Sequence, residues 1–357
     1  MKLPIAVGIV GCGYWGPNLA RIFSGSAQAH LTALCDPAIE RRRHMQGLHP
    51  QVAVFDNFCA MLANRDLDAI VIATPANTHF AIAKASLLAG KHVLVEKPMA
   101  STSRECKELI EIARERSLIL MAGHTYLYSE AVAKIAEIVA SGDLGEIRYI
   151  NCQRLNLGLF QQDINVAWDL APHDFSVILK IMGEPPVTVN CQGNAHIHPR
   201  IEDVTNISLA FGGKRFATIQ SSWLEPRKVR QMTFVGTRKM IVYDDLQPLE
   251  KIRIYDVRVD CPPYYDSFAD FHCSYHYGDC YIPRLKQGEP LVNMCRHFLE
   301  CIAGETAPLS GGAAGLEVVR LLEACDASLR SHGAPVDFPA SGIIPLPSNQ
   351  QLLTVAG

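Results

Sequence analysis

Three glycines near the start of the chain constrain its fold more than any other feature. Gly11, Gly13 and Gly16 have the spacing G-x-G-x-x-G, and they directly follow the apolar run Ile5–Val10. The first glycine permits a tight turn, the second permits close approach to the backbone, and the third lets a helix pack against the strand. Pro17 comes next, and proline suits the first position of a helix. The segment therefore predicts a buried strand, a glycine turn and a helix.

Short apolar runs recur through the first third of the chain. They are Ile5–Val10, His30–Cys35, Val52–Phe55, Ala69–Ile72, His92–Glu96 and Ile119–Ala122. Apolar runs without polar alternation are typical of parallel strands buried on both faces. Helical stretches separate them, and one has the capping-box pair Thr102 and Glu105. This alternation predicts a Rossmann domain with a doubly wound parallel sheet over residues 1–124.

The glycine turn predicts a dinucleotide site, because the helix N-terminus binds a pyrophosphate. Asp36 ends the second strand, 20 positions after Gly16. An aspartate there accepts the ribose 2′-hydroxyl and repels a 2′-phosphate, which favours NAD over NADP. The basic run Arg41–Arg43 could weaken this preference. The expected cofactor contacts around the turn are Gly11, Gly13, Tyr14, Trp15, Gly16 and Asp36.

After Gly123 the pattern changes to alternating strands and a few helices, which predicts a second, α+β domain over residues 125–340. Helices are expected at Ser129–Ser141 and Leu170–Met182, with a strand Ile147–Arg154 between them. Further strands are expected at Pro186–His196, Val204–Phe211, Ala217–Trp223, Arg230–Gly236 and Lys239–Asp244. Such strands form an open, mostly antiparallel sheet. We expect its uncovered apolar face to form a homodimer or homotetramer, and residues 341–357 to form an extended tail.

The composition excludes several classes of protein. The 357 residues carry a net charge of −3, without a basic stripe that could follow a nucleic acid. Apolar runs long enough to span a membrane are absent from the sequence. Twelve cysteines occur without a C-x-x-C pair, which indicates free thiols in a reducing cytoplasm.

The cluster His272, Cys273, His276 and Cys280 has no spacing typical of a structural zinc site, so we expect a histidine-rich loop there and no metal.

Polar residues follow two of the predicted parallel strands, at the edge where open α/β sheets bind ligands. One group follows Ala69–Ile72 and the other lies at the end of His92–Glu96. The expected cofactor contacts in these groups are Thr74, Pro75, Asn77, His79, Glu96 and Lys97. Lys97 can polarise a reacting oxygen and stabilise a developing alkoxide. Asn77 and His79 either contact the cofactor or cap the next helix.

A candidate proton-transfer pair lies in the predicted helix of the second domain. Asp169 and His173 are four residues apart, which places them on one helix face. Oxidation of an alcohol needs a base within hydrogen-bond reach of the hydroxyl, and imidazole titrates near neutral pH. We therefore expect His173 to act as the base and Asp169 to orient it or to bind the substrate.

The run from Thr74 to Pro98 and the segment Trp168–Asp174 resemble the glucose–fructose oxidoreductase/inositol dehydrogenase (Gfo/Idh/MocA) family. The resemblance covers nearly the whole chain. It implies a Rossmann domain followed by an open-faced α/β domain, with the active site between them. It also implies that Lys97 and His173 lie at the reacting carbon.

A further resemblance is to one branch of that family. It lies in Trp168–Asp174 and in the segments Arg154–Gly158, Ser222–Arg230, Tyr275–Asp279, Glu289–Leu291 and Cys295–Phe298. This branch oxidises the 3-hydroxyl of UDP-N-acetylglucosamine, or of its uronic acid, to a 3-keto sugar that an aminotransferase then uses. The implied substrate contacts are His124, Tyr126, Arg154, Asn156, Trp168, Arg227, Lys228, Arg230, Tyr275 and Tyr277. The basic residues could hold a diphosphate and a tyrosine could stack on uracil, or these charges could be a solvated sheet edge.

The preferred interpretation is a cytoplasmic NAD-dependent 3-dehydrogenase of UDP-N-acetylglucosamine, which serves surface polysaccharide or lipid A synthesis. The uronate is a second possible substrate, although it calls for an arginine fork separate from the diphosphate site. Two different activities compete with this interpretation: a glycoside hydrolase that keeps NAD bound, and a non-catalytic dinucleotide sensor. The intact set Lys97, Asp169 and His173 argues against the sensor.

Overall fold

The computed structural model describes residues 4–63, 66–260 and 273–339. The chain forms two compact units. The first unit comprises Met1–Ser129 and Gly288–Glu323, and the second comprises Glu130–Gln287 and Ala324–Gly357. The predicted tail 341–357 lies outside the described residues.

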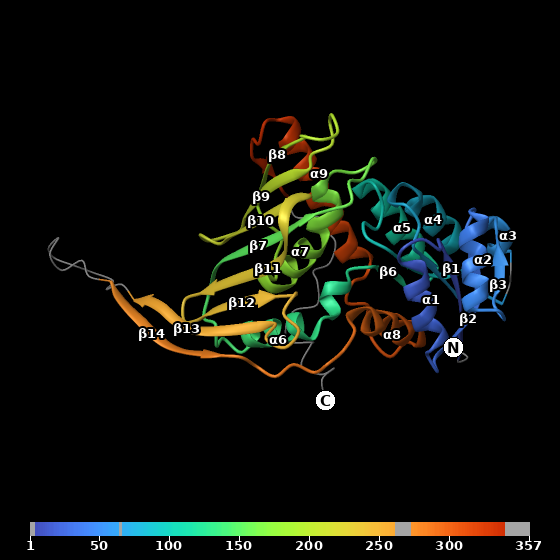
Figure 1. The fold of residues 1–357 in the computed structure, drawn as a ribbon, viewed down its shortest axis with the longest axis horizontal. Coiled ribbons are helices and arrows are strands. Elements are labelled where there is room, and N and C mark those ends of the chain that lie inside the picture. The colour runs from blue at the N-terminus through green and yellow to red at the C-terminus, as the bar shows by residue number, and fades with distance from the viewer. Residues whose placement is uncertain (1–3, 64–65, 261–272, 340–357) are drawn as a thin grey trace. The chain divides into compact units, whose positions relative to one another are not determined.

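The first unit is built on a six-stranded sheet with the order β3-β2-β1-β4-β5-β6 (Figure 1). All pairs of neighbouring strands in this sheet are parallel. The strands are β1 (Ile5–Val10), β2 (Ala29–Cys35), β3 (Ala53–Phe55), β4 (Ala69–Ile72), β5 (His92–Val95) and β6 (Leu120–Ala122). This arrangement confirms the predicted doubly wound parallel sheet.

Helices connect the strands of the first unit. They are α1 (Gly16–Ser24), α2 (Ile39–Leu48), α3 (Phe58–Leu62), η1 (Ala76–Thr78), α4 (His79–Leu88), α5 (Ser103–Glu115) and η2 (Thr125–Tyr128). The capping box of α5 is present, since the Thr102 hydroxyl accepts the Glu105 amide and the Glu105 carboxylate accepts the Thr102 amide. The predicted start of α5 is therefore confirmed.

The segment Gly288–Glu323 belongs to the first unit, whereas we expected it in the second domain. It contains α8 (Pro290–Ala303) and the first part of α9 (Gly312–Arg330). Leu291 and Phe298 of α8 lie in the same buried core as β1 and α1, which explains the placement. A contact of such sequence separation cannot be read from local apolar periodicity.

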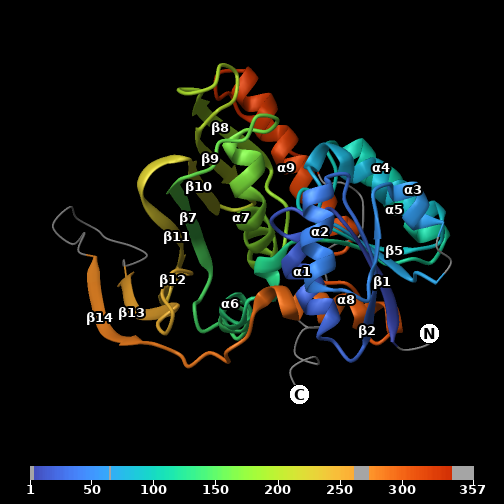
Figure 2. The same cartoon turned by 45° about the vertical axis from the view of Figure 1, so that its right-hand side comes forward.

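The second unit is built on a nine-stranded sheet with the order β14-β13-β12-β11-β7-β10-β9-β8-β15 (Figure 2). Its strands are β7 (Ile147–Leu157), β8 (Thr188–Asn194), β9 (Val204–Ala210), β10 (Phe216–Ser222), β11 (Leu224–Gly236), β12 (Met240–Asp244), β13 (Ile252–Asp260), β14 (Ser274–Tyr281) and β15 (Val336–Asp337). Only β7 and β10 pair in parallel among these strands. The predicted mostly antiparallel sheet is thus confirmed.

Two helices of the second unit are α6 (Glu130–Ala140) and α7 (Val166–Met182). Helix α7 begins four residues before the predicted start, because the side chain of Asn165 caps it by accepting the Trp168 amide at 3.1 Å. It packs against β7, β9 and β10 on one face of the sheet.

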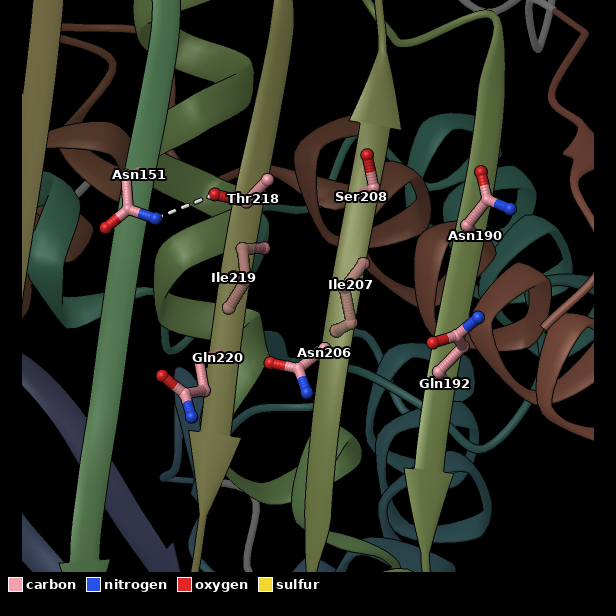
Figure 3. A pocket seen from close by; sticks show the side chains of 9 residues that line it. All are labelled: Asn151, Asn190, Gln192, Asn206, Ile207, Ser208, Thr218, Ile219 and Gln220. Atoms are coloured by element: carbon pink, nitrogen blue, oxygen red, sulfur yellow. Dashed lines mark hydrogen bonds between the residues drawn. The ribbon is translucent and has the colours of Figure 1, made fainter.

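The opposite face of this sheet, which we expected to be apolar, carries polar rows over β7, β10, β9 and β8. The stacked rings of Tyr149 and Phe216, with centroids 5.2 Å apart, lie on the same face. Figure 3 shows amide and hydroxyl side chains projecting from β7, β10, β9 and β8. In one row across these strands, Asn151 donates to the Thr218 hydroxyl at 2.8 Å, and Ser208 and Asn190 continue the row. They line a hollow of about 430 Å³. The buried apolar residues that alternate with them belong to the face on which α7 packs.

Two local predictions in the region 272–280 need correction. The expected loop is strand β14, which pairs with β13, and His276 contacts Asp256 at 3.0 Å. Cys273 is disulfide-bonded, whereas the other described cysteines are free thiols, as expected. His272 lies outside the described residues. Among the described helices, none is long and apolar enough to cross a membrane.

Candidate active site

The glycine turn of the first unit has the shape that a dinucleotide requires. Gly11 has a φ of +95°, and a Cβ there would lie 2.5 Å from the Ala73 carbonyl oxygen. A Cβ on Gly16 would lie 2.2 Å from the Gly11 carbonyl oxygen. At Gly13, by contrast, nothing lies closer than 3.8 Å to such an atom, which leaves the backbone approachable. The residues present therefore fit a pyrophosphate at the start of α1.

The aromatic residues of the turn are exposed. Tyr14 is 82% exposed and Trp15 is 42% exposed, and their rings meet edge to face with centroids 5.2 Å apart. Trp15 precedes α1 without a side-chain capping bond. The side chain of Trp15 therefore leaves the backbone amides in the first turn of α1 available to an anionic ligand.

Asp36 lies at the end of β2, beside this turn. Its Oδ2 accepts the Cys12 amide at 2.8 Å and its Oδ1 accepts the Ala38 amide at 2.8 Å. Arg41 lies 3.6 Å from the same carboxylate. The structure therefore places Asp36 where a ribose contact is expected, but the carboxylate is buried and holds the backbone of the turn.

His79 connects the two strand-end groups of the first unit. Its Nδ1 lies 2.7 Å from the Pro98 carbonyl oxygen and its Nε2 lies 2.9 Å from the Thr74 carbonyl oxygen. Burial lowers the pKa of His79, while the two carbonyls raise it in opposition. Its contacts tie the loop after β4 to the loop after β5.

The remaining polar residues after β4 differ in exposure. Thr74 is half-buried and accepts the Thr78 hydroxyl at 2.7 Å, whereas Pro75 and Asn77 are exposed. The N-cap of α4 is Thr78, without a side-chain capping bond. The alternative that Asn77 or His79 caps this helix is therefore wrong, and a cofactor contact remains a prediction.

Glu96, Lys97 and His124 form an ionisable group around the loop after β5. The Lys97 amide donates to Glu96 Oε2 at 3.3 Å. Burial raises the pKa of Glu96 to about 7, against the opposing charge of Lys97. Burial and then Lys97 lower the pKa of His124 to about 4. Tyr126, two residues further along, is half-buried in η2.

Asp169 and His173 occupy successive turns of α7, as their spacing predicts, and both are half-buried. The indole Nε1 of Trp223 donates to Asp169 Oδ2 at 3.2 Å. Trp223 is only 1% exposed. Because a buried ring cannot change rotamer easily, it holds the Asp169 carboxylate in one orientation, one turn before the imidazole.

Trp168 and Arg154 both have internal partners in the second unit. The indole of Trp168 donates to Asp326 at 2.9 Å. Arg154 makes a bidentate ion pair with Asp174, at 3.0 Å and 2.8 Å, and is 5% exposed. A buried guanidinium already paired with a carboxylate is not available as a diphosphate ligand, so the expected role of Arg154 needs correction.

The other expected substrate contacts lie on strands of the second unit. Arg227 and Lys228 are exposed on β11, and Arg230 lies 3.7 Å from Asp245. Tyr275 and Tyr277 are exposed on β14, with parallel rings whose centroids lie 6.5 Å apart. Asn156 is half-buried on β7. The basic residues and the tyrosines therefore lie on different strands.

Trp223 and Arg41 contact these sites although the sequence did not predict either as a site residue. Trp223 had a usable signal, since it ends a predicted strand and its indole needs an acceptor when buried. Arg41 was identifiable only as part of a basic run. Its position beside Asp36 depends on the path of the chain between β2 and α2, which the residue pattern does not fix.

Two family profiles match the chain. The profile described as "Oxidoreductase family, NAD-binding Rossmann fold" matches residues 5–124. The profile of the Gfo/Idh/MocA C-terminal domain matches residues 132–242. Together they cover more than half of the chain and follow each other in the order expected for one protein family.

Curated relatives are similar over part of their length. UDP-N-acetylglucosamine 3-dehydrogenase of Acidithiobacillus ferrooxidans is 31% identical over 201 residues, which are 56% of this chain and 61% of the relative. 2,7-anhydro-N-acetylneuraminate hydratase of Escherichia coli is 25% identical over 234 residues, 60% of this chain and 61% of the relative. The chain thus spans about three fifths of the length of these relatives.

Solved structures share the fold at low identity. UDP-N-acetylglucosamine 3-dehydrogenase GnnA from A. ferrooxidans is 24% identical with a TM-score of 0.74, covering 92% of this chain and 98% of that one. The WlbA dehydrogenase from Bordetella pertussis, in complex with NADH and UDP-GlcNAcA, is 19% identical with a TM-score of 0.76, covering 94% and 99%. These likenesses establish the fold of both units.

The glycine turn and the aspartate after β2 indicate the same dinucleotide-binding fold as the first family profile, and the second profile matches the family's C-terminal domain. The first unit is an NAD-binding Rossmann domain. The chain belongs to the Gfo/Idh/MocA oxidoreductase family.

Proposed function

We propose that this protein oxidises the 3-hydroxyl of a UDP-linked amino sugar, UDP-N-acetylglucosamine, with NAD as hydride acceptor. The observation that carries the chemistry is the Asp169–His173 pair on α7, with Asp169 fixed by Trp223. The similarity to UDP-N-acetylglucosamine 3-dehydrogenase, at 31% identity, supports the choice of sugar. The product, a 3-keto sugar, suits transamination in surface polysaccharide or lipid A synthesis in the cytoplasm.

In this mechanism each protein group has one task. His173 takes the proton from the sugar hydroxyl, which is how a general base lowers the barrier. Asp169 holds the imidazole or a neighbouring hydroxyl in place. Lys97 stabilises the negative charge that develops on the reacting oxygen. NAD, when bound, supplies the hydride acceptor.

The rest of the substrate would contact exposed groups of the second unit. Arg227, Lys228 and Arg230 supply cations for a diphosphate, and Tyr275 or Tyr277 supplies a ring for uracil. Arg154 is left out of this proposal because Asp174 already occupies its guanidinium. His124, Tyr126, Asn156 and Trp168 remain proposed contacts near the sugar.

A second substrate candidate is the corresponding uronate. The solved structure of the WlbA dehydrogenase contains NADH and UDP-GlcNAcA, and it shares the fold of this chain. With Arg154 paired internally, the arginines proposed for the diphosphate would also have to bind the carboxylate. This favours the uncharged sugar.

The experiment is an assay of NADH absorbance with the purified protein, NAD and each of the two UDP sugars. We expect NADH and a 3-keto product with UDP-N-acetylglucosamine. His173→Asn should lower kcat about a hundredfold or more, and Lys97→Ala should abolish turnover while NAD still binds. Lys107→Ala, on the exposed face of α5, is the control for a lost lysine charge.

Three outcomes would count against the proposal. NADH formed only with the uronate would make the second candidate correct. Free sugar without NADH would indicate the glycoside hydrolase. Binding without any product from a panel of UDP-hexosamines would remove the dehydrogenase activity altogether.

We also propose that the chain forms a homodimer or homotetramer through the face of the second-unit sheet opposite α7. Three of the residues on this face, Gln192, Asn206 and Gln220, are amides in register on β8, β9 and β10. Two copies related by a twofold axis can exchange hydrogen bonds between such rows.

A further inference from the structure

Asp36, the acidic residue that we expect to select NAD, is buried. The side chain of Asp36 is 2% exposed, and each of its oxygens accepts a backbone amide, from Cys12 at 2.8 Å and from Ala38 at 2.8 Å. These two bonds hold the carboxylate toward the interior of the turn. A ligand that approaches the end of β2 from outside therefore meets little of the carboxylate surface.

Arg41 is the cation that lies beside this carboxylate. Its Nη1 lies 3.6 Å from Asp36 Oδ2, while 58% of its side chain remains exposed. The same Nη1 lies 3.8 Å from the position that a Cβ would take on Gly13. The guanidinium is thus placed between the acid after β2 and the glycine that allows close approach to the cofactor.

The neighbouring arginines do not share this position. Arg42 donates from Nη1 to the carbonyl oxygens of Asp36 and Pro37, both at 2.8 Å, so it fastens the backbone at the start of α2. Arg43 is exposed on α2. Of the three, Arg41 is the one whose charge lies beside the carboxylate and the glycine turn.

We propose that Arg41 binds a 2′-phosphate on the adenosine ribose, so that the site accepts NADP as well as NAD. An arginine beside the ribose site is the usual means of accommodating a 2′-phosphate. The guanidinium offers several donors to phosphate oxygens, and its charge offsets the repulsion that Asp36 exerts on a phosphate. NAD lacks this phosphate, so its binding does not depend on Arg41. The inference requires the dinucleotide site only and is independent of the sugar substrate.

Calorimetric titration of the full chain with NAD and with NADP tests this. For the natural protein we expect dissociation constants within about tenfold of each other. Arg41→Ala should raise the dissociation constant of NADP at least about tenfold, equivalent to about 1.4 kcal/mol. It should change the dissociation constant of NAD by less than about threefold. Arg43→Ala, which removes the same charge from another position on α2, should change neither constant.

Asp36→Asn provides an independent check, because it removes the repulsion and keeps an acceptor for a backbone amide. This variant should bind NADP more tightly, relative to NAD, than the natural protein does. The proposal is wrong if Arg41→Ala leaves the ratio of the two constants unchanged, or weakens both cofactors equally. It is also wrong if the natural protein binds NADP more than about a hundredfold more weakly than NAD. Failure of the sugar assay would not affect these binding results.

Discussion

His124 shows how the environment of one residue sets its charge. Its side chain is fully buried, and neither ring nitrogen has a hydrogen-bond partner among the residues that the structure describes. Burial, followed by the charge of Lys97, lowers its pKa to about 4. Glu96, which also faces Lys97, has its pKa raised by burial to about 7. The charge of Lys97 therefore acts on a neutral imidazole and on a carboxyl group that titrates near neutral pH.

Stability should depend on the protonation of His124. The unfolded chain binds this proton near pH 6.5 and the folded chain only near pH 4. The stability that comes from keeping His124 neutral is therefore fully present above pH 6.5 and is lost as the pH falls toward 4. We expect His124→Phe to reduce the loss of unfolding free energy between about pH 8 and about pH 5 by about 2 kcal/mol.

Urea unfolding at the two pH values measures this effect. His44→Asn, an exposed histidine of α2, is the control and should behave as the natural protein does. A pH dependence of His124→Phe equal to that of the natural protein would show that this imidazole is not kept neutral by the fold.

Among the elements, α7 carries the proposed proton-transfer pair and must be held in register with the sheet. The bidentate ion pair between Arg154 of β7 and Asp174 of α7 does this at the position next to His173. Both side chains are almost fully buried, at 6% and 2% exposure. Removing one partner would leave the other charge buried and uncompensated.

We expect Arg154→Met to lower the free energy of unfolding by about 3–5 kcal/mol, measured by urea unfolding. The double variant Arg154→Met, Asp174→Leu should recover most of that loss, because it leaves no isolated charge. If Arg154→Met instead kept full stability and only weakened binding of the UDP sugar, Arg154 would be a substrate ligand after all.

The sequence predicts some elements better than others. Strands β1 and β4 have the same bounds as predicted, because continuous apolar runs in a parallel sheet are recognisable locally. Where β14 forms, the sequence predicts a loop, because its alternating tyrosines do not mark a buried face and only pairing with β13 makes it a strand.

The candidate site shows the same limit. Gly11, Gly16 and Asp36 follow from spacing, since each is needed at a fixed distance from a strand end. The partner of Arg154 lies 20 residues away on another element, and no local pattern identifies it. Side chains that act through long-range pairing are therefore not predictable from the sequence of one chain.

At the scale of the whole molecule, we expect copies of the protein to associate through the sheet face opposite α7, which carries Gln192, Asn206 and Gln220. We expect Gln220→Lys, at the centre of that face, to shift the protein toward a smaller species, because like charges would meet across the twofold axis. Sedimentation velocity measures the change. Leu249→Lys adds the same charge at a position that is 79% exposed and should leave the size unchanged. A Gln220→Lys variant of unchanged size would exclude this face as the interface.

The row of amides extends over five adjacent strands, as Gln192, Asn206, Gln220, Gln153 and Gln231. None of these five side chains titrates or carries a charge, so ions in solution have nothing to screen there. Contacts made through this row should keep their strength at high ionic strength. The cofactor site, with its arginine and aspartate, should respond to added salt.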